Sequence, residues 1–366
     1  MFTISLCMII KNEEDTIERC LSSVKGIVDE IILADTGSDD RTKEIASRFT
    51  DKIYDFKWIN DFSAARNFAY EQATMDYILW LDADDIILPE DVVKFKSLKE
   101  TMAPDIDVVM MKYNTGFDAQ GRVTFSYFRE RLSKRTRNYK WREPVHEYLE
   151  AAGKRINADI CITHAKPHGR PGTRNISIYE NLLAKGGELS PRGMYYFARE
   201  LKDHERYADA ITWFSLFLDS RLGWVEDNIA ACGEMADCYE AENKHPEALL
   251  SMLRSFGYDT PRAETCCQIG YYFMEQSRYG QAAFWFELAL KVEKDKNCLG
   301  FQQEDYWGYI PCIELAVCYD RLGEHEKAAS YNEMAFEFKP ESLAVLQNKK
   351  YFEDKLRTNT NIQLKH

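Results

Sequence analysis

Two carboxylates, one residue apart, follow an apolar run, and this pattern can hold a hard divalent cation. The run covers residues 77–81 and leads into Asp82-Ala83-Asp84. Carboxylate oxygens suit Mg²⁺ and Mn²⁺, and Mg²⁺ is commonly held by one or two carboxylates together with substrate phosphates. Acidic turns after strands are also common without a metal, so the triplet alone favours a plain surface turn.

Alternating strands and helices surround this triplet and would place it at the edge of a sheet. Apolar runs predict strands at residues 4–10, 29–34, 52–56 and 76–81. Helical spacing of apolar residues predicts helices at residues 14–24, 40–49 and 63–73. Such repeated units indicate a mainly parallel sheet, whose ligands bind beyond the carboxyl ends of the strands. Asp35 and the carboxylates of residues 82–85 fall at those ends, which favours a metal–nucleotide site over a structural turn.

The chain changes character after residue 105. Residues 108–117 and 122–134 have the pattern of a β-hairpin, and a basic stretch covers residues 129–142. This stretch is either a solvated strand face or a group of cations near a phosphate. The Gly- and Pro-containing loop at residues 166–172 would close a first domain, which we place at residues 1–186.

An internal repeat marks the second half of the chain. Small residues recur with spacings of 38, 34 and 46, at Ala198, Ala236, Gly270 and Ala316. A second small residue follows each of them by twelve positions, at Ala210, Ala248, Ala282 and Ala328. This half resembles the tetratricopeptide repeat, a two-helix unit of about 34 residues. We expect an all-α repeat domain at residues 187–352, with an insertion near residues 295–307, and a flexible tail at residues 353–366.

Repeat stacks form concave binding surfaces, so this half is expected to bind a partner or to form a homodimer. A purely structural helical cap is the alternative. The net charge of −13, from 47 basic and 60 acidic residues, argues against a nucleic-acid partner. No run is long and apolar enough to span a bilayer. The ten cysteines are scattered at mostly apolar positions, as in a reducing compartment, so we expect a cytoplasmic protein.

Four ordered motifs in the first ninety residues together resemble the family 2 glycosyltransferases of the GT-A fold. They lie at residues 9–13, 35–42, 60–67 and 81–85. The resemblance implies an α/β domain with a Rossmann-like mixed sheet that binds a nucleoside diphosphate sugar. Because a carboxylate can accept a hydrogen bond from a uracil N–H, a UDP-sugar is the expected donor.

The resemblance also implies individual roles. Residues near the carboxyl ends of the first two strands would hold the base and ribose, and Arg66 would approach the diphosphate, since guanidinium groups form forks with phosphate oxygens. The expected nucleotide-sugar contacts are Ile10, Asn12, Glu13, Asp35, Ser38, Arg66, Asp82 and Ala83. Asp82 and Asp84 would hold Mg²⁺ or Mn²⁺, with Asp84 the direct ligand.

Residues 141–147, together with His164 and Arg174-Asn175, are similar to a narrower subset of this family. That subset includes bacterial peptide S-glycosyltransferases of the sublancin type and some lipopolysaccharide-core glucosyltransferases. Within this segment, Glu147 and His146 are the candidates for the catalytic base, because a Glu or His commonly takes the acceptor proton. His146 could instead be a metal ligand or pack on Trp141, and Glu143 and Asp85 are the reserve candidates for the base.

The leading hypothesis is a metal-dependent inverting glycosyltransferase that moves a sugar from a UDP-sugar to a Cys, Ser or Thr side chain of a peptide or protein. The repeats would help to recognise that acceptor. A cell-surface glycan or lipopolysaccharide-type acceptor is the alternative. A non-catalytic repeat scaffold that binds nucleotide-sugar is a third possibility. Nucleotidyl transfer is disfavoured because no Gly-rich phosphate loop follows the first strand.

Overall fold

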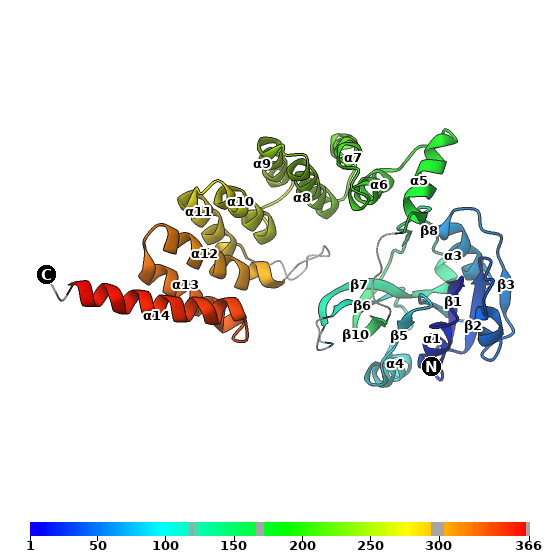
Figure 1. Cartoon of the computed structure of the whole chain (residues 1–366). Coiled ribbons are helices and arrows are strands. Elements are labelled where there is room, and N and C mark those ends of the chain that lie inside the picture. The colour runs from blue at the N-terminus through cyan, green and yellow to red at the C-terminus, as the bar shows by residue number, and fades with distance from the viewer. Residues whose placement is uncertain (118–120, 122, 166–171, 294–303, 364–366) are drawn as a thin grey trace. The chain divides into compact units, whose positions relative to one another are not determined.

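The structure is a computed structural model that describes residues 1–117, 121, 123–165, 172–293 and 304–363, with only the backbone described for 358–363. The chain divides into two compact units, Met1–Leu189 and Ser190–His366 (Figure 1). In these described parts of the chain, no helix combines the length and apolarity that a membrane span requires.

The first unit is built on an eight-stranded mixed sheet, as predicted. The strand order is β3-β2-β1-β4-β7-β6-β10-β5. The strands are β1 Ile4–Ile10, β2 Glu30–Asp35, β3 Ile53–Asp55, β4 Tyr77–Trp80, β5 Asp85–Ile86, β6 Val108–Phe117, β7 Val123–Lys134 and β10 Arg155–His164. β1 to β4 form a parallel block, and β7 joins this block in the antiparallel sense. The predicted hairpin is confirmed as β6 and β7.

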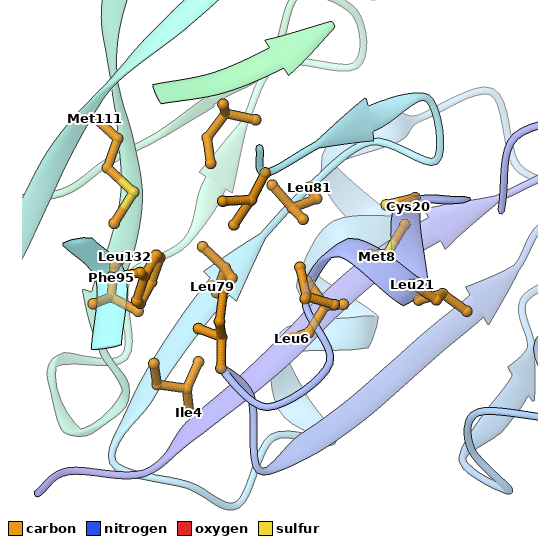
Figure 2. Close-up of a cluster of buried hydrophobic side chains, with 14 of the residues drawn as sticks. Ile4, Leu6, Met8, Cys20, Leu21, Leu79, Leu81, Phe95, Met111 and Leu132 are labelled. Atoms are coloured by element: carbon orange, nitrogen blue, oxygen red, sulfur yellow. The ribbon is translucent and has the colours of Figure 1, made fainter. Parts of the chain in front are cut away.

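Helices cover both faces of the sheet because side chains alternate along each strand. Ile4, Leu6, Met8 and Ile10 of β1 are buried against residues of α1 (Ile17–Ser23) and α4 (Pro89–Thr101) (Figure 2). The opposite face of the parallel block, including Ile78 of β4, packs against α3 (Phe62–Glu71). The sheet is therefore held rigid where the carboxyl ends of β1, β2 and β4 emerge. The short helix α2 (Thr42–Ala46) follows β2, and α5 (Arg174–Ala184) is the last helix of this unit.

Three short strands were not expected from the sequence. β5 pairs antiparallel with the end of β10 and places His164 opposite Asp85. A separate two-stranded ribbon consists of β8 (Trp141–Arg142) and β9 (Tyr148–Leu149). The ribbon encloses residues 143–147, the segment that carries the candidate base.

The second unit is all-α, as predicted. Its described residues form four helical hairpins followed by a final helix. The helices are α6 Pro191–Asp203, α7 Tyr207–Ser220, α8 Val225–Ala241, α9 His245–Arg254, α10 Ala263–Glu275, α11 Tyr279–Lys291, α12 Tyr309–Arg321, α13 His325–Phe338 and α14 Leu343–Gln363. The repeated alanines are buried within the hairpins. At Gly270 a Cβ atom would come within 2.7 Å of the Phe286 ring, so this helix crossing requires a glycine.

Residues 353–363, expected to be a flexible tail, belong to helix α14, while 364–366 lie outside the described residues. The expected insertion near 295–307 is described only at its end, where a short 3-10 helix covers Glu304–Trp307.

Candidate active site

The acidic residues after β4 form a tight turn at the edge of the sheet. The Asp85 backbone N–H donates to the Asp82 carbonyl oxygen at 3.0 Å, and the Asp82 N–H donates to Oδ2 of Asp85 at 3.1 Å. The turn buries Asp85 completely and leaves Asp82 and Asp84 partly exposed. Of the three carboxylates in this turn, those of Asp82 and Asp84 therefore lie at the rim of the sheet.

Arg66, on α3, links this turn to the segment between β8 and β9. Its Nη2 atom lies 2.7 Å from Oδ1 of Asp82, and its Nε atom lies 2.6 Å from Oε1 of Glu147. The guanidinium also contacts two indole rings that meet edge to face, 5.0 Å from the centre of Trp80 and 4.8 Å from the centre of Trp141. The structure thus brings together three residues predicted separately.

Electrostatics favour the charged forms of Arg66 and Asp82. Burial opposes the charge on Arg66, but the attraction of Asp82 and Glu147 outweighs it and raises the pKa of Arg66. Burial also opposes the charge on Asp82, but the guanidinium groups of Arg66 and Arg131 outweigh it and lower the pKa of Asp82. Asp82 is therefore an ionised carboxylate that the Arg66 guanidinium holds in place.

Asp84, Asp85 and His164 form a group with metal-ligand chemistry. One ligand atom from each lies within 4.8 Å of the others. The Nδ1 atom of His164 is 3.5 Å from Oδ1 of Asp84 and 3.8 Å from Oδ1 of Asp85. Hydrogen bonds that His164 donates to these two carboxylates raise its pKa to about 10. Asp82, predicted as a metal residue with Asp84, is not a member of this group.

Asp85 is fixed from two sides. Its Oδ2 atom accepts from Nη1 of Arg131 at 3.0 Å, and its Oδ1 atom accepts from the Tyr113 hydroxyl at 2.8 Å. Arg131, which is fully buried, lies 3.8 Å from the centre of the Trp80 ring. Both oxygens of Asp85 are thus already engaged, so Asp84 and His164 are better placed than Asp85 to donate to a cation.

The carboxyl ends of β1 and β2 form a second, polar part of the rim. The Asp35 carboxylate accepts from the Gly37 N–H at 3.1 Å and from the Ser38 hydroxyl at 2.5 Å. Ser38 Oγ accepts from the Asn12 N–H at 3.1 Å, and Thr36 N–H donates to the Ile10 carbonyl at 3.0 Å. These bonds fix the two chain segments that the resemblance assigns to the nucleotide.

The loop that carries the two candidate bases, Glu147 and His146, contains two residues with a positive φ. His146 has φ 53° and Glu143 has φ 74°, a region that side-chain-bearing residues rarely adopt. Such residues cluster at functional sites, because the surrounding structure must hold them there. Glu147 pairs with Arg66, as described above. His146 is not a member of the group formed by Asp84, Asp85 and His164.

Several site residues escaped prediction as individuals. Arg131 was noted only as part of a basic stretch, and Tyr113 and Trp80 were assigned to strands alone. A period-two pattern on the hairpin would have suggested that Arg129 and Arg131 share a face. Both guanidinium groups lie over Trp80, at 5.0 and 3.8 Å from the ring centre.

A cavity of about 340 Å³ lies elsewhere in this unit. It is lined by the end of α3, the start of β4 and residues 133–140, including Lys134, Arg135 and Lys140. Those elements meet at the amino end of β4, so this cavity is at the edge of the sheet opposite the carboxylates.

Comparison with known proteins agrees with this architecture. Residues 5–164 match the sequence profile of the family described as "Glycosyl transferase family 2". The first unit therefore contains a glycosyltransferase domain of family 2, which confirms the resemblance based on the four motifs.

Curated relatives include a protein named for TPR repeats and a protein named as a glycosyltransferase. A TPR repeat-containing protein of Synechococcus elongatus is 38% identical over 151 residues, which cover 41% of this chain and 36% of the relative. The SPbeta prophage-derived glycosyltransferase SunS of Bacillus subtilis is 30% identical over 226 residues, covering 58% of this chain and 52% of SunS. The chain thus spans about a third to a half of these curated relatives.

One solved structure is similar to part of the chain. The C-terminal part of a TPR repeat-containing protein from Cytophaga hutchinsonii matches with a TM-score of 0.43 and 17% identity. The match covers 51% of this chain and 67% of that one.

Proposed function

We propose that this protein is a metal-dependent inverting glycosyltransferase that uses a UDP-sugar. The observation that carries the proposal is the meeting of Asp82, Asp84, Arg66 and Glu147 at one rim of a family 2 domain. Residues that we propose to bind the donor lie there beside a candidate base, which supports sugar transfer.

The residues present fit a divalent cation. Asp84 and His164 offer a carboxylate oxygen and an imidazole nitrogen, and Asp85 lies close by with both of its oxygens already hydrogen-bonded. Carboxylates suit Mg²⁺ and Mn²⁺, and the imidazole favours a transition metal, so we expect Mn²⁺ to be bound better than Mg²⁺. A cation bound there would supply Lewis-acid stabilisation of the charge on a departing diphosphate. This assignment replaces the pair Asp82 and Asp84 with Asp84 and His164.

Asp35, Ser38, Asn12, Glu13 and Ile10 are proposed to hold the uridine at the ends of β1 and β2. Asp82 and Ala83 would lie against the ribose and diphosphate, and Arg66 would share its guanidinium between Asp82 and a phosphate oxygen. In the transfer step, the acceptor atom bonds to the anomeric carbon as the bond to the diphosphate breaks. Glu147 takes the acceptor proton, with His146 the alternative.

The acceptor is proposed to be a Cys, Ser or Thr side chain of a peptide or protein, bound in part by the repeats. Support comes from the resemblance of residues 141–147 to peptide-modifying enzymes and from the concave surface that such repeats form. A cell-surface glycan is the alternative. A cytoplasmic site of action is proposed because all nine described cysteines are free thiols.

The proposal is tested by release of UDP from a panel of UDP-sugars in the presence of Mn²⁺. We expect slow hydrolysis with at least one sugar, and faster release when a cysteine- or serine-containing peptide accepts the sugar. The enzyme assignment fails if no UDP is released and if UDP with Mn²⁺ causes no thermal shift.

A further inference from the structure

Helix α3 holds residues 141–147, which comprise β8 and the loop that leads to β9, through contacts to their backbone that are independent of Arg66. The Asn67 side-chain amide pairs with one residue of the segment in both directions. Its Oδ1 atom accepts from the Trp141 N–H at 2.8 Å, and its Nδ2 atom donates to the Trp141 carbonyl at 3.0 Å. At the start of the helix, the Phe62 N–H donates to the Pro144 carbonyl at 2.9 Å.

The contacts follow the segment in order. Asn67 holds its beginning at Trp141, Phe62 holds its middle at Pro144, and Arg66 holds its end at Glu147. Because Arg66 and Asn67 are neighbours on one helix, the position of the carboxylate depends on how the beginning of the segment is fixed. The pairing of Trp141 with Leu149 in the ribbon passes this constraint to both ends of the loop.

The segment needs such support. It contains two left-handed residues without a glycine, Glu143 and His146, and its ribbon has only two residues in each strand. Isolated two-stranded hairpins are marginally stable, so a contact from outside must hold the loop. Tyr179 of α5 adds one bond, from its hydroxyl to the Val145 carbonyl at 3.3 Å.

We propose that Asn67 is a positioning residue that fixes the segment of residues 141–147 on α3 and so sets where the Glu147 carboxylate lies. The proposal rests on the proposed function, since it assigns Glu147 the acceptor proton. Asn67 itself does not touch the substrate. Its influence passes through the backbone of Trp141 and the ribbon to Glu147.

The test is a double-mutant cycle on UDP release from a UDP-sugar with Mn²⁺. We expect Asn67→Ala to lower kcat by about 10- to 100-fold, because a displacement of about 1 Å can cost two orders of magnitude. The KM for the donor should change little. In the Glu147→Gln background, Asn67→Ala should have no further effect, because residues that act as a unit are not additive. A purely structural role would give additive losses, which would overturn the proposal.

Controls separate this effect from misfolding. Gln72→Ala removes a local bond from the end of α3 to the Phe68 carbonyl and should leave kcat unchanged. Asn67→Asp keeps the acceptor for the Trp141 N–H and loses the donor, so an intermediate kcat is expected. If Asn67→Ala does not fold, the cycle is completed with Asn67→Asp.

Hydrogen exchange tests the positioning role even if the wild type releases no UDP, in which case the proposed function fails separately. Asn67→Ala should increase exchange in residues 141–149 without changing exchange in β1 and β2. Unchanged exchange in residues 141–149 would overturn the positioning role whatever the activity.

Discussion

Arg66 is the residue on which both halves of the proposed reaction depend. It bonds Asp82 on the donor side and Glu147 on the acceptor side within 2.7 Å, and only 8% of its side chain is exposed. A buried cation is tolerated when carboxylates and hydrogen bonds compensate it. The same guanidinium therefore orients two carboxylates that have different proposed roles. A diphosphate bound near Arg66 would compete with Asp82 for hydrogen bonds from this guanidinium.

The clearest residue-level prediction concerns Glu147. We expect Glu147→Gln to slow sugar transfer to a hydroxyl acceptor such as water, measured as the rate of UDP release, by at least ~100-fold. This factor is the lower limit for loss of a general base. The matched control is Glu150→Gln, three residues away, where the carboxylate is exposed and pairs with Arg142. Near-normal turnover in Glu147→Gln would remove Glu147 from the base role and favour His146. A thiol acceptor would show a smaller loss, because a thiol of pKa about 8.5 already supplies thiolate.

A second carboxylate, Glu30 of β2, stabilises the domain rather than the site. Burial opposes its charge, but hydrogen bonds from Lys52, Ser5 and Thr74 outweigh this effect and lower the pKa of Glu30 to about 2. Because the folded-state pKa lies below the ordinary value of 4.5, this stabilisation is present at neutral pH and is lost as the pH falls from about 4.5 toward 2.

We therefore expect Glu30→Gln to lower the free energy of unfolding by about 3 kcal/mol at pH 7, and by clearly less at pH 3. Urea unfolding of wild type and variant at both pH values measures the difference. Glu44→Gln, at an exposed pair with Arg41, serves as the control and should change little. An equal loss at pH 7 and pH 3 would contradict the assigned role of Glu30.

The sequence predicted the residues of the rim better than their partners. Asp35, Asp82 and Asp84 were predicted because they follow strands, and Arg66 was predicted because it belongs to the motif at residues 60–67. The approach of His164 to Asp84 could not be found in this way, because it depends on the antiparallel pairing of β10 with β5. β5 has only two residues, too few for a period of two to be visible.

At the scale of elements, the turns of the helical hairpins repeat as regularly as their alanines. Each hairpin has a residue with φ between 56° and 82° after its first helix, at Glu205, Asn243, Ser277 and Gly323. The next N–H bonds back to the first helix, for example from Glu324 to the Tyr319 carbonyl at 2.9 Å. This is the usual way to end a helix, and glycine suits it best.

These turns give a paired stability prediction. Gly323→Ala should lower the free energy of unfolding by about 1 kcal/mol, because alanine is strained at φ +82°. Gly280→Ala should instead raise it by about 0.5–1 kcal/mol, because Gly280 lies within α11 with open space around its Cα. Thermal unfolding of both variants checks the signs. The same sign for both would show that the turn geometry is not the cause.

The first strands and helices and the hairpin of β6 and β7 were predictable because their apolar residues follow a regular period, whereas β10 and α4 were not predicted although they have 10 and 13 residues. β1 alternates between two faces, and the hairpins keep their small residues in register. The ribbon of β8 and β9 was not predictable, because Asn67 and Arg66 hold it from outside. Its stability comes from tertiary contacts that the local sequence does not contain.

At the scale of the whole molecule, each unit has its own hydrophobic core. One cluster contains Leu6, Leu79 and Phe95 of the first unit, and another contains Phe286, Leu315 and Phe352 of the second. A unit with a separate core can in principle fold alone. We propose that the first unit binds the donor and the second recognises the acceptor. These two roles can therefore be tested separately on a fragment of the chain.

We expect a fragment of residues 1–189 to unfold cooperatively and to keep the thermal shift with UDP and Mn²⁺. Slow hydrolysis of the UDP-sugar should remain, whereas transfer to a peptide should be lost. Calorimetry and a UDP-release assay on the fragment and the full chain make the comparison. Full transfer activity in the fragment would show that the repeats do not recognise the acceptor.

The central claim is that Asp84 and His164 hold the cation on which sugar transfer depends. The most direct test is the initial rate of Mn²⁺-dependent UDP release by wild type, Asp84→Ala and the exposed control Asp159→Ala, whose side chain is 85% accessible. The account predicts a rate at least ~100-fold lower in Asp84→Ala, as expected when the charge stabilisation of a leaving group is removed, and an unchanged rate in the control. Wild-type release that persists with EDTA, or Asp84→Ala release equal to that of the wild type, would contradict it.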